Sequence, residues 1–210
     1  MKTENAILMK MARESLRGKW GISIGASVIF MVIMMVIQIV PFVGFIAYLA
    51  ITGPMSLGLI IFFLSLSRNQ EVEIGQLFKG FENFGTSLVA YLLMCLFIFL
   101  WTLLLIIPGM IASLAYSMTF YIIADNNSIG AMDAIKKSKE MMQGNKWKLF
   151  CLYWRFFGWS LLCLLTLGIG YLWLVPYIQT SIAKFYDDIK GNQTNPSEQS
   201  PIQQTPTPAV

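Results

Sequence analysis

The fold is decided by an uncharged stretch at residues 20–67, which reads WGISIGASVIFMVIMMVIQIVPFVGFIAYLAITGPMSLGLIIFFLSLS and contains no Asp, Glu, Lys or Arg. About 20 apolar residues in a helix cross a bilayer, so this stretch is long enough for two crossings. Pro41 and Gly44 interrupt the helical pattern near its middle. The stretch therefore predicts a helical hairpin in a membrane.

Two further stretches, residues 83–124 and 156–183, also lack charged side chains. The first of them predicts a second hairpin, with its turn at Pro108-Gly109. The other reaches spanning length once the apolar residues from Leu149 are added, and Arg155 is then the only charge inside it. Hydrophobic residues make up 56% of the chain and charged residues 12%. We therefore predict an all-α, polytopic helical membrane protein.

The predicted organisation has an N-terminal segment, a membrane domain and a tail. Residues 1–20 are expected to form an interfacial amphipathic helix, because apolar side chains recur there at helical spacing. Residues 68–82 and 125–148 predict similar surface-lying segments. Residues 187–210 are rich in Gln, Pro, Thr and Ser and predict a disordered cytoplasmic tail. The membrane domain, residues 21–186, is expected to hold about six transmembrane helices, at about 21–40, 46–66, 86–107, 110–124, 149–167 and 171–185.

The basic residues predict the orientation in the membrane. Five lie in residues 1–20, two in 68–82 and five in 125–148, and Lys184 and Lys190 follow the last span. With six spans, all four segments lie on one side, and the opposite loops have no Lys or Arg. Short cytoplasmic loops carry the excess of basic residues. We therefore expect a multi-pass protein of the cell membrane with both termini in the cytoplasm.

Two features predict contacts with anionic lipid. Arg155 has two interpretations: its side chain extends to the interface, or it binds an anion or lipid phosphate. A lysine cluster near a charged surface contributes about 1 kcal/mol per lysine, although the ordinary cytoplasmic bias explains it as well. The cluster comprises Lys136, Lys137, Lys139, Lys146 and Lys148. The expected partners are therefore membrane lipids with anionic headgroups, and a membrane-protein partner or a second copy is a further alternative.

Catalytic, metal-binding and cofactor-binding residues are not expected. The chain has no histidine, which excludes Ser-His and Cys-His nucleophile pairs. Its three cysteines form no CxxC pair, and no Gly-rich phosphate loop or nucleic-acid motif accompanies the basic residues. We expect a protein that is not an enzyme and does not bind nucleic acid.

Residues 13–20, RESLRGKW, can be aligned with residues 139–147, KEMMQGNKW, with one gap. One interpretation is that any interfacial helix entering a membrane offers Gly, Lys and Trp. The other is an internal duplication in which the first two spans match the last two, an arrangement common in transporters.

Several short motifs occur in a characteristic order along residues 10–188. They are Ala12-Arg13, Gly18-Lys19-Trp20, Leu77-Phe78, Gly80-Phe81, Ile106-Ile107-Pro108-Gly109-Met110, Tyr116-Ser117-Met118, Ala124-Asp125, Gly144-Asn145-Lys146-Trp147, Pro176-Tyr177 and Phe185-Tyr186. Together they resemble the bacterial integral-membrane family called domain of unknown function nine-seven-five. The resemblance implies a multi-span membrane protein without an established activity. That family is also similar to the membrane domain of some glycerophosphodiester phosphodiesterases, but no catalytic residue can be transferred from them.

The leading functional hypothesis is a non-enzymatic membrane protein that acts through lipid or protein contacts in envelope maintenance. The alternative is a small-solute transporter or lipid-translocating protein built on the internal repeat. That alternative needs a polar path between the spans. The sequence offers scattered candidates for it: Gln38, Thr52, Ser56, Thr102 and Thr166.

Overall fold

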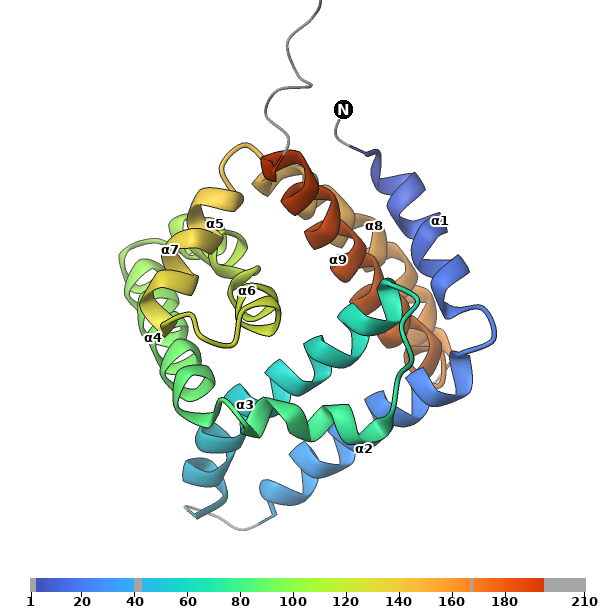
Figure 1. The fold of residues 1–210 in the computed structure, drawn as a ribbon, viewed down its shortest axis with the longest axis horizontal. Helices are drawn as coiled ribbons and strands as arrows, with labels where there is room; N and C mark the ends of the chain where they lie inside the picture. The colour runs from blue at the N-terminus through green and yellow to red at the C-terminus, as the bar shows by residue number, and fades with distance from the viewer. Residues whose placement is uncertain (1–2, 40–42, 167, 195–210) are drawn as a thin grey trace, which may run out of the picture.

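The computed structural model describes residues 3–39, 43–166 and 168–194. These residues form nine α-helices and one 3-10 helix, η1, and they contain no β-strand. The all-α prediction is therefore confirmed. The N-terminal segment and the C-terminal end of the last helix lie on the same side of the molecule (Figure 1).

The chain repeats one arrangement three times: a short amphipathic segment, then a hairpin of long apolar helices. Unit one consists of α1 (Asn5–Leu16), α2 (Trp20–Ile37) and α3 (Val43–Ser67). Unit two consists of η1 (Ile74–Phe81), α4 (Phe84–Leu104), α5 (Ile106–Tyr116) and α6 (Thr119–Asp125). Unit three consists of α7 (Ala131–Met141), α8 (Lys146–Leu165) and α9 (Tyr171–Thr194). In each unit the returning arm of the hairpin contains a proline, at Pro54, Pro108 or Pro176.

The short segment of each unit packs on the hairpin of another unit. The 3-10 helix η1 lies on α3, α7 lies on α4 and α6, and α1 closes the ring by lying on α9. Figure 1 shows the resulting ring, with α3, α6 and α9 toward its interior. The α3–η1 contact is the closest, because a Cβ atom on Gly58 would overlap the carbonyl oxygen of Leu77 and one on Gly80 would overlap that of Pro54.

The two sequence segments that we aligned form the same local structure. Gly18 separates α1 from α2 with φ of 80°, and Gly144 separates α7 from α8 with φ of 72°. Left-handed backbone favours glycine, because a side chain there meets the following carbonyl oxygen. Units one and three therefore share a glycine turn between the amphipathic helix and the first hairpin helix. Unit two has the same order of elements, but the turn between η1 and α4 contains no glycine with positive φ.

Within the described part of the chain, five helical segments are long and apolar enough to cross a membrane, judged by length and composition alone. They are Trp20–Ile37, Ala47–Ser67, Phe84–Leu104, Ile106–Asp125 and Lys146–Leu165. These correspond to the first five expected spans, although the fourth consists of two helices, α5 and α6. The expected sixth span, residues 171–185, is the first part of α9, where Lys184, Asp187 and Asp188 make the helix less apolar than the other five segments.

The disorder predicted from residue 187 onward is not found in the first part of that tail. The helix α9 continues to Thr194, so residues 187–194 are helical instead of disordered. Asp188 explains part of this, because its side chain binds Lys148 on α8 and fixes the end of α9 to the bundle. The remaining part of the expected tail, residues 195–210, lies outside the described residues.

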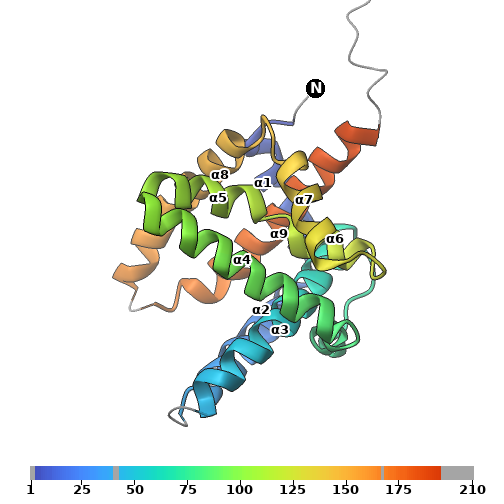
Figure 2. The same ribbon diagram turned by 90° about the vertical axis from the view of Figure 1, so that its left-hand side faces the viewer.

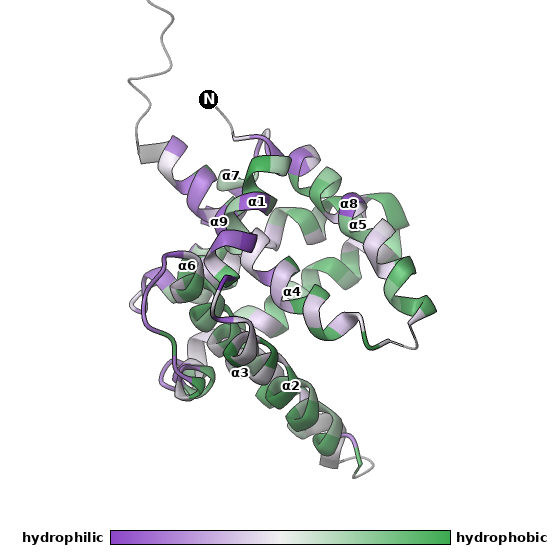
Figure 3. Cartoon of the chain, turned by 90° about the vertical axis from the view of Figure 1, so that its right-hand side faces the viewer, coloured by the Kyte–Doolittle hydropathy of each residue, from purple (hydrophilic) through white to green (hydrophobic). Residues whose placement is uncertain are grey.

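Apolar and polar surfaces lie at different ends of the molecule. The hairpin turns expose large apolar side chains, such as Met35, Leu104, Ile106 and Leu165. These turns lie at the left and lower left of Figure 2, away from α7 and the C-terminal end of α9. Hydrophilic residues gather at the opposite end, on α1, the end of α9 and the loops (Figure 3). Exposed apolar helices with one polar end are typical of a protein surrounded by lipid.

Candidate functional site at the charged end of the bundle

The C-terminal ends of the three returning helices meet at one guanidinium group. Arg68, the first residue after α3, donates from Nη1 and Nη2 to the two carboxylate oxygens of Asp125 at 2.7 Å and 3.1 Å. The same Nη2 donates to Asp187 on α9 at 2.7 Å. A planar guanidinium offers donors in a fixed fork, which lysine cannot reproduce. Arg68 therefore joins all three units.

Two residues of α9 also bind Asp125, whose side chain is only 12% exposed. Lys190 Nζ lies 2.5 Å from Asp125 Oδ2, and the Tyr186 hydroxyl donates to that oxygen at 2.9 Å. The hydrogen bond to Asp125 raises the pKa of Arg68 above its ordinary value, although partial burial works in the opposite direction. Burial and the charge of Asp125 raise the pKa of Tyr186. Both groups therefore remain donors at neutral pH.

A second buried ion pair fixes α8 to α9. Lys148 Nζ lies 2.6 Å from Asp188 Oδ2, and the two side chains are 15% and 10% exposed. Lys148 also lies over the ring of Phe185, 5.4 Å from its centroid. The hydroxyl of Thr3 donates to Asp188, so the start of the chain joins the same group. A charge pair this buried loses its hydration, and breaking it leaves an uncompensated charge.

The structure divides the predicted lysine cluster. Lys136, Lys137 and Lys139 are exposed on α7, and Lys136 is 3.9 Å from the equally exposed Asp133, a pair of little energetic value. Lys146 is half-buried at the start of α8. Lys148 does not lie on the same exposed surface, because its side chain is 15% exposed and forms an ion pair with Asp188. The five lysines therefore do not form one binding surface.

Arg155 lies on α8 and is exposed. Its Nη1 is 4.0 Å from the sulfur of Met9 on α1, so the side chain lies against the N-terminal helix. Among the described residues it has no carboxylate partner. Both interpretations made from the sequence, extension to the interface and contact with an anion, remain predictions.

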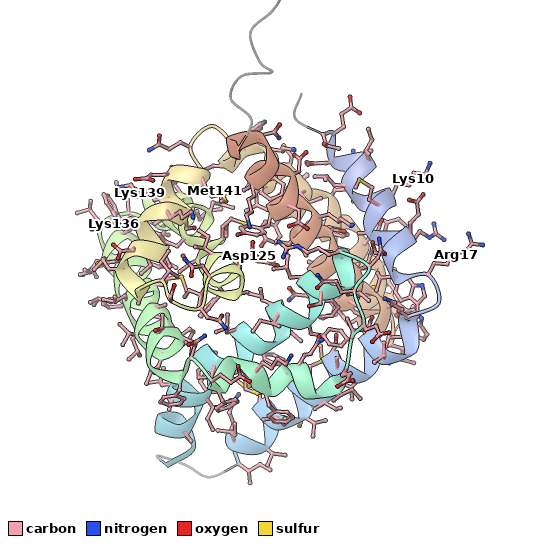
Figure 4. The ribbon with its side chains drawn as sticks, viewed as in Figure 1. Lys10, Arg17, Asp125, Lys136, Lys139 and Met141 are labelled. Atoms are coloured by element: carbon pink, nitrogen blue, oxygen red, sulfur yellow. The ribbon has the colours of Figure 1, made fainter. Side chains whose placement is uncertain are left out.

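Two groups of basic side chains among the described residues differ in whether they have a partner within the chain. Arg68, Lys148 and Lys190 bind carboxylates at the charged end, and Lys184 donates to the carbonyl oxygen of Ser67. The second group lies on α1 and its C-cap, α7 and α8 and has no ion pair within residues 3–39, 43–166 and 168–194; it comprises Lys10, Arg13, Arg17, Lys137, Lys139, Lys146 and Arg155. Figure 4 shows Lys10 on α1 and Arg17 directly after it directed away from the bundle, and Lys139 directed away from it on α7. We call this second group the unpaired cations.

The sequence analysis missed the cluster around Arg68, yet the signal for it was present. Arg68 directly follows the first uncharged stretch, Asp125 directly follows the second, and Lys184 directly follows the third. The first polar residue after an apolar returning helix must lie at the membrane surface. Because the three returning helices end on the same side of a small bundle, the charged residues that follow them, of opposite sign, lie close together.

The polar residues proposed for a transport path are dispersed. Ser56 lines a cavity of about 400 Å³ between the three units, together with Tyr91, Ser117 and Gln179. Gln38 and Thr52 line a separate cavity of about 380 Å³. The hydroxyls of the other two, Thr102 and Thr166, donate to carbonyl oxygens of the preceding turn of their own chain segments.

The described residues contain no group of three or more His, Cys, Asp or Glu side chains placed to hold a metal ion. The carboxylates gathered at the charged end, those of Asp125, Asp187 and Asp188, instead contact cations of the same chain. In the structure these carboxylates form interhelical ion pairs that connect α3, α6, α8 and α9.

Five spanning-length helices, exposed apolar hairpins and one polar end define a multi-pass helical membrane protein. The chain belongs to the family described as protein of unknown function (DUF975), which matches residues 1–111 and 102–193. The resemblance to that family is thus confirmed. The match does not show the expected similarity to the membrane domain of glycerophosphodiester phosphodiesterases. No curated protein matches the chain, and no solved structure matches it.

Proposed function

We propose that this protein is a non-enzymatic membrane protein that binds anionic lipids through its unpaired cations. The observation that carries the proposal is the division of its basic side chains. The cations at the charged end already have carboxylates or a carbonyl oxygen as partners. The unpaired cations face outward on α1, α7 and α8, next to the apolar surface that lipid covers. Phosphate groups of anionic lipids are the counter-charges available there.

Exposed aromatic side chains support this placement. Trp147, Phe150, Trp154 and Phe157 stack in sequence along α8, with centroid distances of 5.3, 6.2 and 5.5 Å. Trp147 and Trp154 are 74% and 66% exposed. Amphipathic aromatic rings are enriched at the level of the headgroups. On this proposal the charged end faces the cytoplasm in the cell membrane, and the lipid contact serves envelope maintenance.

The test measures the lipids that remain around the protein after extraction in native membrane particles. A double variant, Lys137→Gln and Lys139→Gln, is compared with a second double variant of the same helix, Asp133→Asn and Glu140→Gln. The ratio of phosphatidylglycerol to phosphatidylethanolamine is expected to fall in the first and to stay equal or rise in the second. Equal ratios in the wild type and both variants would contradict a role for the charge of α7.

The cavity between the three units supports a second candidate function, small-solute transport. Its polar lining includes Ser56, Tyr91 and Gln179, which come from one helix of each unit. Polar side chains between membrane helices often mark a solute pathway. Glycerol is a suitable neutral probe in proteoliposomes: on this alternative, Gln179→Leu reduces its flux, whereas Thr102→Val does not. Flux equal to that of protein-free vesicles would eliminate the alternative for this probe class.

A further inference from the structure

A groove of about 440 Å³ lies where α1 and α2 meet α8 and α9. Arg13 contributes from α1 and Trp20 from the start of α2. The remaining lining residues come from unit three, and they are Trp159, Cys163, Gly170, Trp173, Leu174 and Tyr177. One charged side chain and several aromatic rings therefore share a single concave surface between units one and three.

Two arginines lie at the polar end of the groove. Arg13 lines it directly, and Arg155 lies one helical turn before Trp159 on α8. The guanidinium of Arg155 contacts Met9, which lies one turn before Arg13 on α1. Because neither arginine has a carboxylate partner among the described residues, this end of the groove carries uncompensated positive charge.

The other end of the groove is apolar and reaches the α8–α9 turn. Its floor on α9 extends from Tyr177 to Gly170, which is about 10 Å of helix rise. Trp159 and Trp173 line this part and are 54% and 51% exposed, so the groove opens to the surroundings of the bundle. Those surroundings are hydrocarbon at the level of the hairpins. One end of the groove therefore presents positive charge, suited to an anionic headgroup, and the other presents aromatic side chains, suited to an acyl chain.

We propose that the groove binds one phospholipid with an anionic headgroup. The lipid phosphate contacts Arg13, Arg155 and the Tyr177 hydroxyl, and the first part of an acyl chain lies against Trp159 and Trp173. This inference rests on the proposed function, because it assigns one lipid of the anionic class to a defined place. It adds Arg13, Tyr177 and the two tryptophans to the residues predicted from the sequence. Free phosphate would leave the apolar walls without a ligand, and so a lipid is the occupant.

The experiment uses phosphatidylglycerol with a photoactivatable group on one acyl chain, incorporated into nanodiscs that contain the full chain. After illumination, crosslinked peptides are mapped by mass spectrometry. Residues 159–177 are expected to carry most of the crosslinks. Arg13→Gln is expected to reduce them about tenfold, the effect of one charge-assisted hydrogen bond. Arg17→Gln is the matched control, because this exposed arginine directly follows the same helix but does not line the groove.

Crosslinks spread evenly over all exposed helices in the wild type would overturn the proposal, and so would equal losses in Arg13→Gln and Arg17→Gln. The phosphatidylglycerol to phosphatidylethanolamine ratio is measured in the same nanodiscs. A raised ratio with evenly spread crosslinks would eliminate the groove but retain general binding of anionic lipid. A ratio equal to that of the bulk lipid, together with even crosslinks, would eliminate both. If Arg13→Gln fails to fold, Tyr177→Phe provides the same comparison, with Tyr171→Phe as its control.

Discussion

Arg68 and Asp125 are 57 residues apart in the chain, yet their side chains form a two-point ion pair at 2.7 and 3.1 Å. The pair joins the end of α3 to the end of α6, and Asp187 and Lys190 extend it to α9. A single ionic cluster thus holds the three hairpins together at the end where the unpaired cations also lie.

Replacing Asp125→Ala is expected to destabilise the protein. Arg68 would keep only Asp187, and the Lys190–Asp125 pair would be lost. Breaking such a partly buried cluster costs about 2 kcal/mol, less than a fully buried pair because water screens Arg68. Thermal unfolding in a mild detergent measures the loss. The control is Asp133→Ala, which removes an exposed pair and is expected to leave the melting temperature unchanged.

Replacing Gly80→Ala is expected to displace η1 from α3, because the new Cβ atom overlaps the carbonyl oxygen of Pro54. Overpacking of this kind costs about 1–3 kcal/mol. Amide hydrogen exchange should increase over residues 74–81. Gly75→Ala lies in the same 3-10 helix but meets no atom within 4 Å, so its exchange should match the wild type. Equal exchange in Gly80→Ala would show that η1 does not depend on this close approach.

A side chain at the turn glycine Gly144 is expected to destabilise the protein, because the backbone there is left-handed, with φ of 72°. Gly144→Ala should reduce the free energy of unfolding by about 1 kcal/mol. Gly21→Ala, in the helix α2 with open space around it, should be neutral or slightly stabilising. Denaturation of both variants by the same detergent titration compares them. A loss confined to Gly21→Ala would contradict the account of this turn.

The orientation of the protein can be measured with single cysteines in a variant that lacks Cys95, Cys151 and Cys163. Ser128→Cys lies in the exposed loop before α7, and Ile169→Cys lies in the exposed α8–α9 turn. With the charged end in the cytoplasm, a membrane-impermeant thiol reagent should label Ile169→Cys in intact cells and Ser128→Cys only after the membrane is opened. The reversed pattern would place the basic loops outside.

The class of fold was predictable from residues 20–67 and 83–124, because a long uncharged stretch has few stable structures other than membrane helices. The end of α9 was not predictable in the same way. Residues 187–194 look like a polar tail, and their helix depends on Asp188 meeting Lys148, which is 40 residues away. Tertiary ion pairs of this kind leave no periodic signal in the sequence.

The lipid-contact residues that the sequence suggested remain predictions, and the structure places them differently from one another. Arg155, Lys137 and Lys139 have no ion pair in the described structure, whereas Lys136 lies 3.9 Å from Asp133. Lys148 looked equivalent to Lys146 in sequence, but one faces Asp188 in the interior and the other does not. Arg13 was noted only as a basic residue of the first segment, because its approach to Tyr177 depends on how α1 lies on α9.

The central claim is that the unpaired cations recognise anionic lipid. The most direct test is native mass spectrometry of the wild-type chain released from nanodiscs with equal phosphatidylglycerol and phosphatidylethanolamine. Lipid exchange is completed at ionic strengths from about 0.1 M to about 1 M, over which the screening length falls from about 10 Å to about 3 Å. The account predicts an excess of retained phosphatidylglycerol at low ionic strength that declines as ionic strength rises. Equal retention of the two lipids at every ionic strength would contradict it.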